Sequence, residues 1–72
     1  MKVYVLMRLY DYEPGELLGV HSTKDKAVAA IPDSEREYGH EYPEPAKYDS
    51  TCVYSWVFPS SGAIEVYERE VE

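Results

Sequence analysis

Three side chains in this sequence could do chemistry: His21, His40 and Cys52. The segment Glu37-x-x-His40-Glu41 places an imidazole and two carboxylates close enough to approach a metal ion. A stable zinc site assembles three or four ligands at recognisable spacings, and this chain has neither a second cysteine nor a histidine pair. We therefore expect no metal site and interpret both histidines as solvated surface residues.

Cys52 and His21 could serve as a nucleophile and its base. A catalytic thiol needs surroundings that stabilise the thiolate and a third group that orients the base, and the sequence shows neither. Cys52 lies in an apolar alternating run, which is typical of a small buried hydrophobic residue. No pair of carboxylates suited to acid–base catalysis is distinguishable among the 14 acidic residues. We predict a non-enzymatic protein with no catalytic residues and no cofactor.

The acidic residues fall into three groups, each with a tyrosine nearby: at the first turn, in a central segment and in the last strand. Carboxylates at phosphate-like intervals can occupy the basic groove of a nucleic-acid-binding protein by pairing with Arg and Lys. The candidate partner-binding residues are Asp11, Glu13, Glu16, Glu35, Glu37, Tyr38, Glu41, Tyr42, Glu44, Glu65, Glu68 and Glu70. The same charges could instead keep a small aromatic-rich protein soluble and block edge-to-edge sheet pairing.

Two function hypotheses follow. The first is a small acidic protein-binding module that occupies a basic, nucleic-acid-binding site on a protein partner. The alternative is a small self-associating structural or assembly protein with no catalytic role. Eight tyrosines, one tryptophan and one phenylalanine favour binding in both cases, because interfaces use aromatic residues as anchors.

The charge balance disfavours several partners. A net charge of -7 repels phosphate backbones and anionic lipid, so we expect no direct binding to nucleic acid or membranes. No segment approaches the roughly 18 apolar residues of a membrane span, and the N-terminal residues lack the pattern of a signal peptide. A single cysteine fits a reducing compartment. We predict a cytoplasmic protein.

The length of 72 residues favours one domain, residues 1–72. Residues 2–12 alternate in the manner of a β-strand, and Glu13-Pro14-Gly15-Glu16 predicts a turn in which Gly15 accepts a positive φ. Residues 17–21 then form the second arm of a hairpin. Gly19 within that arm suggests a bulge or a close approach of backbone.

A helix start follows at Ser22, which we expect to be the N-cap of Ser22-Thr23-Lys24-Asp25. Apolar residues at helical spacing continue to Ile31, and Pro32 ends a helix of about nine residues. Residues 32–50 contain three prolines and predict a long acidic loop with one helical turn at residues 33–38. Alternation resumes in residues 52–58 and again after the turn residues 59–62, which predicts a second hairpin.

The predicted fold is therefore α+β, with the order ββαββ: a small antiparallel sheet of three or four strands with one short helix packed on one face. We place the aliphatic side of the first strand, Val3, Val5, Met7 and Leu9, beneath the helix. The other face would then present an apolar patch, because a short helix cannot cover both faces. That patch would comprise Tyr4, Leu6, Tyr10, Tyr54, Trp56 and Phe58.

Such a patch exceeds what soluble monomers usually expose. Two coverings remain open: a second copy of the chain, or the 32–50 segment folding back with Tyr38, Tyr42 and Tyr48. We predict a homodimer through the sheet face or an edge strand.

The stretch MKVYVLMRLYDYEPGELLGVHSTKDKAVAAI resembles a loose group of small uncharacterised bacterial and phage proteins. These have a Tyr-rich first strand, an acidic turn, a Gly-Val-x-Ser step and a Lys/Ala helix before a Pro- and Tyr-containing segment. The resemblance covers about the first 31 residues well and the remainder in outline. It supports the fold and implies no catalytic residues. It also implies a phage or mobile-element origin, where small acidic proteins often obstruct a host protein.

Overall fold

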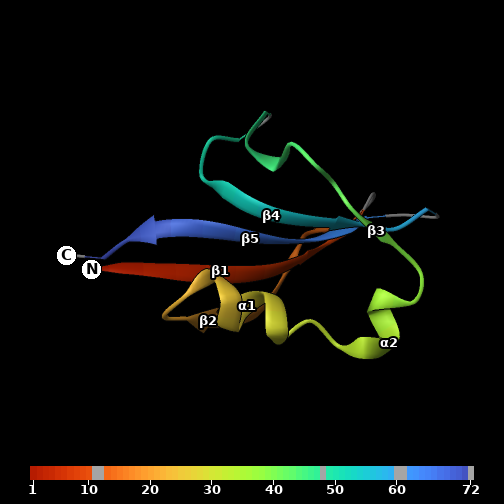
Figure 1. Ribbon diagram of the computed structural model, residues 1–72, viewed down its shortest axis with the longest axis horizontal. Coiled ribbons are helices and arrows are strands. Elements are labelled where there is room, and N and C mark those ends of the chain that lie inside the picture. The colour runs from red at the N-terminus through yellow and green to blue at the C-terminus, as the bar shows by residue number, and fades with distance from the viewer. Residues whose placement is uncertain (11–12, 48, 60–61, 72) are drawn as a thin grey trace.

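A computed structural model describes residues 1–10, 13–47, 49–59 and 62–71 of the chain. Its main feature is one antiparallel five-stranded sheet in the order β2-β1-β5-β4-β3 (Figure 1). The strands are β1 (Lys2–Leu9), β2 (Glu16–His21), β3 (His40–Glu41), β4 (Cys52–Val57) and β5 (Ala63–Glu70). The helices are α1 (Lys24–Ala29), α2 (Asp33–Arg36) and the 3-10 turn η1 (Pro45–Lys47).

The predicted first hairpin is confirmed by the antiparallel pairing of β1 with β2. The register shifts where Leu6 pairs with Gly19 and Met7 with Leu17, so one strand carries an extra residue at Leu18. This confirms the bulge expected near Gly19. The prediction for Gly15 is wrong, because among the described glycines the positive φ belongs to Gly62, at 73°.

Helix α1 is shorter than expected and begins one residue later. Thr23, not Ser22, is the N-cap: its extended backbone aims Oγ1 at the amide of Lys26, which donates to it at 3.1 Å. The helix ends before Pro32, as predicted. Arg36 caps the C-terminal end of α1, because its guanidinium donates to the carbonyl oxygens of Val28 and Ile31.

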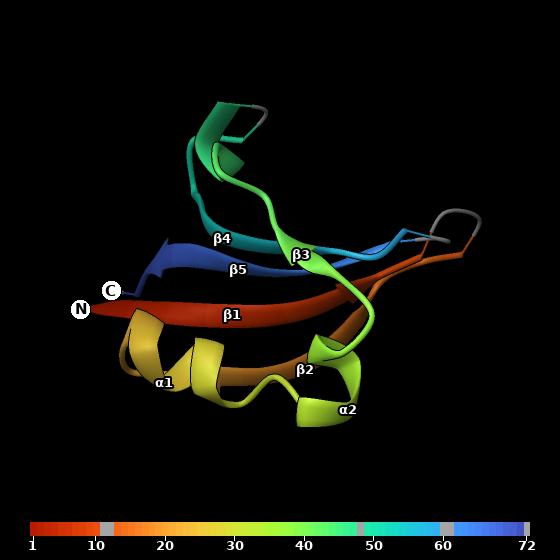
Figure 2. The same ribbon diagram turned by 45° about the vertical axis from the view of Figure 1, so that its right-hand side comes forward.

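The 32–50 segment is more structured than a loop. The predicted helical turn is confirmed as α2, after which the chain crosses to the far edge of the sheet, as Figures 1 and 2 show. There His40 pairs with Val57 and Glu41 with Trp56, which makes β3 a two-residue edge strand. The Tyr42 amide extends this pairing by donating to the Ser55 carbonyl oxygen at 2.8 Å. A strand this short has no recognisable alternation in sequence.

The second predicted hairpin is confirmed by the antiparallel pairing of β4 and β5. Strand β5 also pairs with β1 over eight residues, from Lys2 opposite Glu70 to Leu9 opposite Ala63. The last strand therefore lies at the centre of the sheet. The two termini lie side by side at one end of the molecule (Figure 1).

The core lies on the face of the sheet that α1 covers. It is formed by buried side chains of β1, β4, β5 and α1 and of the residues just after α1 and β4: Leu6, Ala27, Ile31, Tyr54, Phe58, Ile64 and Val66. Our assignment of the strand faces is therefore wrong. Leu6, with Tyr4 packed against the core, lies beneath the helix, and Val3, Val5, Met7 and Leu9 belong to the opposite face.

The physical reason is the amount of apolar surface that each face can bury. Register aligns Leu6 with Val66 and Val66 with Tyr54, so the side of β1 that carries Leu6 faces the same way as the aromatic side of β4. Aromatic side chains bury the largest areas. The predicted exposed patch is consequently wrong as well, because Leu6, Tyr54 and Phe58 are buried in the core.

The fold-class prediction also needs correction. The chain forms one five-stranded antiparallel sheet with only short helices, which is closer to an all-β fold than to a ββαββ fold of three or four strands. Two causes produce the difference. The 32–50 segment contributes an edge strand, and α1 spans six residues in place of about nine.

Candidate functional site

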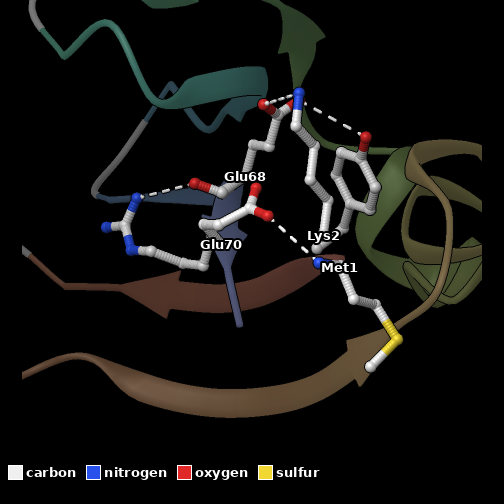
Figure 3. A network of polar contacts seen from close by, with 6 residues as sticks. Met1, Lys2, Glu68 and Glu70 are labelled. Carbon is white, nitrogen blue, oxygen red and sulfur yellow. Dashed lines mark hydrogen bonds and ion pairs between the residues drawn. The ribbon is translucent and has the colours of Figure 1, made fainter. Parts of the chain in front are cut away.

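Four of the predicted partner-binding carboxylates have partners within the chain. Figure 3 shows two of them near the termini: Glu68 pairs with Lys2 at 3.1 Å, and Glu70 pairs with the N-terminal amine at 3.0 Å. The Glu68 contact is the largest cause that raises the pKa of the Lys2 ammonium. Glu35 pairs with Arg8 at 3.1 Å, and Glu65 accepts a hydrogen bond from Tyr67. The charges of Glu35, Glu68 and Glu70 are therefore partly neutralised by cations within the chain, whereas Glu65, whose donor is a neutral hydroxyl, keeps its charge.

The Arg8–Glu35 pair joins β1 to α2. The Arg8 guanidinium carbon lies 4.2 Å from the centre of the Phe58 ring and 5.3 Å from that of Tyr10, which places the cation beside two aromatic rings. Its side chain is 19% exposed. Arg8 and Glu35 therefore act as a structural clamp for α2, and Glu35 is not available as a free charge.

The other acidic candidates are exposed and form no ion pair with the described residues: Glu13, Glu16, Glu37, Glu41 and Glu44. In Figure 1, α2 and β3 lie toward the end of the sheet where β1 ends and β2 begins, away from the termini. We call Glu13, Glu16, Glu37 and Glu41 the acidic end. Asp11, also predicted, lies outside the described residues.

The tyrosines of the 32–50 segment lie in different environments. Tyr38 is 67% exposed just beyond α2, whereas Tyr42 is half-buried against β4. Tyr48 lies outside the described residues. Of the three tyrosines expected to fold back over the second face, Tyr42 does so in part.

A pocket of about 430 Å³ opens on the face of the sheet opposite α1. It lies where β1 and β4 end and β5 begins, beside the residue that follows β3, and its lining is mostly apolar. The lining residues are Leu9, Tyr10, Tyr42, Ser55, Val57, Gly62, Ala63 and Glu65. Pockets of this size and character are typical of small-ligand or side-chain recognition.

Two polar side chains lie together in this pocket. Ser55 and Glu65 are directly opposite each other in the β4–β5 ladder and point to the same face. The Glu65 carboxylate also accepts a hydrogen bond of 2.5 Å from the Tyr67 hydroxyl and a weak one of 3.7 Å from the Cys52 thiol. Burial, with the Glu65 contact second, raises the pKa of the Tyr67 phenol above its usual range.

The Cys52 thiol is inert in this setting. Cys52 is 2% exposed, which confirms the prediction of a buried residue. Burial first and the Glu65 charge second raise its pKa to about 11, so the reactive thiolate is scarce at neutral pH. Within the described part of the chain, no group of His, Cys, Asp and Glu is arranged to hold a metal ion. The described helices include none that is long and apolar enough to span a membrane.

Sequence reasoning named Glu65 and Tyr42 as candidate partner-binding residues but missed the other residues that line the pocket. Ser55, Val57 and Ala63 carry no chemical signal of their own, and Leu9 was assigned to the core. Only the pairing register brings them together: Ala63 lies opposite both Leu9 and Val57. The alternation of β4 could have indicated that Ser55 and Val57 share a face, but not which strand lies beside it.

The chain belongs to the family described as a domain of unknown function (DUF7336), whose model matches residues 1–56. The matched residues run from β1 through most of β4 and leave β5 outside. Neither the curated proteins nor the solved structures include a match to the chain. The expected likeness to small proteins without an assigned function is thus confirmed, while a bacterial or phage origin stays a prediction.

Proposed function

We propose that this member of the family is a small acidic, non-enzymatic module that binds a protein partner through the acidic end. One observation supports this proposal above the others. Glu35, Glu68 and Glu70 are paired with cations of the chain, whereas the carboxylates of the acidic end have no such pairing. Negative charge is thereby concentrated at the end of the molecule away from the termini.

The proposed partner carries a basic surface. Unpaired carboxylates at one end attract Lys and Arg side chains over several ångströms and orient the approaching partner. The same charge opposes direct contact with nucleic acid or anionic lipid. The finer proposal is a cytoplasmic protein of phage or mobile-element origin that occupies a nucleic-acid-binding site of a host protein, and it rests on the charge and on the sequence resemblance.

A matched pair of variants tests this function. The Glu37→Gln/Glu41→Gln variant removes two unpaired charges of the acidic end, and Glu68→Gln/Glu70→Gln removes two paired charges near the termini. Partners captured from a bacterial lysate are identified by mass spectrometry, purified, and titrated by calorimetry against both variants.

We expect the first variant to bind more weakly at low salt and the control to bind like the original chain. The difference should shrink at about 0.5 M salt, because screening then acts within a few ångströms. An affinity that stays constant between low and high salt, or that falls equally in both variants, would contradict the proposal.

Self-association is the second candidate, and the face opposite α1 favours it. Leu17 and Val20 of the edge strand β2 are 59% and 55% exposed there, next to the half-buried Val3, Val5 and Met7 of β1. A second copy that packs on this face would remove the apolar area from water. Sedimentation would then give a stable dimer, and Val20→Glu would return it to the 8.3 kDa monomer. Tyr38→Ser, at an exposed position just beyond α2, is the control and would leave the dimer unchanged. A monomer at high micromolar concentration would exclude this candidate.

A further inference from the structure

We propose that the pocket between β1, β4 and β5 receives a guanidinium group, supplied by an arginine side chain of the protein partner, with the Glu65 carboxylate as its counter-charge. This inference rests on the proposed function and adds to it a specific site. Three features of the pocket support it: an oriented carboxylate with a serine opposite it, apolar walls and a lining without cations.

The carboxylate of Glu65 is oriented in advance and retains capacity for further donors. The Tyr67 hydroxyl donates to Oε1 and the Cys52 thiol approaches Oε2. An ionised carboxylate offers about four lone-pair sites, so each oxygen can accept another donor. Two N–H groups of a guanidinium match two carboxylate oxygens, and this geometry makes Arg–carboxylate pairs both strong and specific.

Ser55 supplies an additional polar partner. Ser55 is 3% exposed and lines the pocket. Its cross-strand position opposite Glu65 places the hydroxyl and the carboxylate on the same face of the sheet, where a ligand N–H group could donate to the hydroxyl oxygen.

The walls favour a guanidinium over an ammonium. Leu9, Val57 and Ala63 provide apolar surface, and Tyr42 adds an aromatic side chain. A guanidinium is planar, weakly hydrated and able to lie against apolar or aromatic surface, while an ammonium is compact and strongly hydrated. Tyr10 also lines the pocket, but its ring already lies beside the Arg8 guanidinium and is not part of the proposed contact.

The charges around the pocket are also suited to a cation. None of the described lining residues is Lys or Arg, so the negative charge of Glu65 is not cancelled within the pocket. Arg69 lies farther along the same strand, where its guanidinium donates to Thr51 Oγ1 and to the Glu68 carbonyl oxygen. Arg69 lies on the same face of the sheet as Glu65, but its guanidinium lies over the Tyr67 ring, and it forms no ion pair with Glu65 among the described residues.

The first experiment titrates N-acetyl-arginine amide into ¹⁵N-labelled protein. N-acetyl-citrulline amide, which has nearly the same shape without the charge, is the matched probe, and N-acetyl-lysine amide tests the choice of cation. We expect the arginine probe to shift the amide signals of Ser55, Val57, Ala63 and Glu65. The lysine probe should bind more weakly, and the citrulline probe should leave these signals in place.

Variants then test the role assigned to Glu65. Glu65→Gln keeps an acceptor for Tyr67 but removes the charge, and we expect it to weaken arginine-probe binding by about tenfold, the loss typical of a charge-assisted hydrogen bond. Glu70→Gln removes an equal charge at the far end and should bind like the original chain. The dispersion of the amide spectrum checks that both variants fold.

The outcomes separate this inference from the proposed function. If Glu37→Gln/Glu41→Gln weakens a basic partner while Glu65→Gln does not, and the arginine probe leaves the pocket signals unchanged, the pocket inference is wrong and the proposed function stands. If the arginine probe binds the pocket but no partner binds in a salt-dependent manner, a partner's arginine is not the source, and the protein-binding function fails. Loss of both probe and partner binding in Glu65→Gln supports the inference in full.

Discussion

Leu6 and Val66 lie directly opposite each other in the β1–β5 ladder, and their side chains are 1% and 0% exposed. Sixty residues of sequence separate them, yet their contact forms the centre of the core beneath α1. It joins the first and last strands of the sheet. The sheet is therefore complete only when β5 pairs with both β1 and β4.

Leu6→Ala should strongly destabilise the protein. Truncating a fully buried leucine removes apolar contacts and leaves a cavity, which costs about 2–5 kcal/mol. Leu17→Ala is the matched control, since Leu17 is 59% exposed on β2 and its loss should change the free energy of unfolding by about 0.5 kcal/mol or less. Urea denaturation of both variants measures the difference. Equal losses in the free energy of unfolding of the two variants would contradict the burial of Leu6 in the core.

Thr23→Ala should destabilise the protein by about 0.5–2 kcal/mol, because the Lys26 amide loses the hydroxyl that caps α1. Ser22→Ala is the control. Its hydroxyl accepts only from the exposed Lys26 ammonium, at 3.3 Å, so its loss should matter little. Thermal unfolding followed by circular dichroism compares the two. A larger effect at Ser22 would restore the capping position expected from the sequence.

Gly62→Ala should cost about 1–3 kcal/mol, the range for a residue held in a sparsely populated conformation. Gly62 has a φ of 73°, and a Cβ there would lie 2.1 Å from the Leu9 carbonyl oxygen. In Gly19→Ala the nearest atom is the tip of the His21 ring at 3.0 Å, which can move. Chemical denaturation should therefore show a clearly smaller loss for Gly19→Ala. A larger loss of stability for Gly19→Ala than for Gly62→Ala would contradict the backbone conformation of Gly62.

The folded protein should lose stability at alkaline pH. The Cys52 pKa lies at about 11, above the ordinary 9.0, and the Tyr67 pKa is also raised, so the folded state holds these protons more tightly than the unfolded state. The contribution of Cys52 is complete below pH 9 and is lost as the pH rises through about 11. Denaturation midpoints at pH 8 and pH 11 measure this loss. The drop should be smaller in Cys52→Ala and in Tyr67→Phe.

The same pKa makes Cys52 slow to react. At pH 8 a shift from 9.0 to about 11 lowers the thiolate fraction by about 100-fold, and burial slows the reagent further. Ellman's reagent should therefore modify the folded protein at least 100-fold more slowly than the protein in denaturant. A rapid reaction of the folded protein would mean that β4 opens readily or that the thiol is exposed.

Local features of the sequence determined much of the secondary structure. Alternation predicted both hairpins, Gly19 indicated the bulge beside Leu18, and Pro32 marked the end of α1. These predictions succeed because strand alternation, turn chemistry and the geometry before proline are set by neighbouring residues. The buried state of Cys52 followed from the same alternation.

Only the tertiary structure decided which face of β1 is buried, where β3 forms and which carboxylates are paired. Both sides of β1 are apolar, so its alternation could not choose between Leu6 and Val5. The choice depends on register with β4 and β5, more than 40 residues away. Strand β3 exists because His40 and Glu41 meet an open edge of β4. The pocket joins Leu9, Ser55 and Glu65 for the same reason: strand pairing brings together residues that are distant in the sequence, and no local pattern records that pairing.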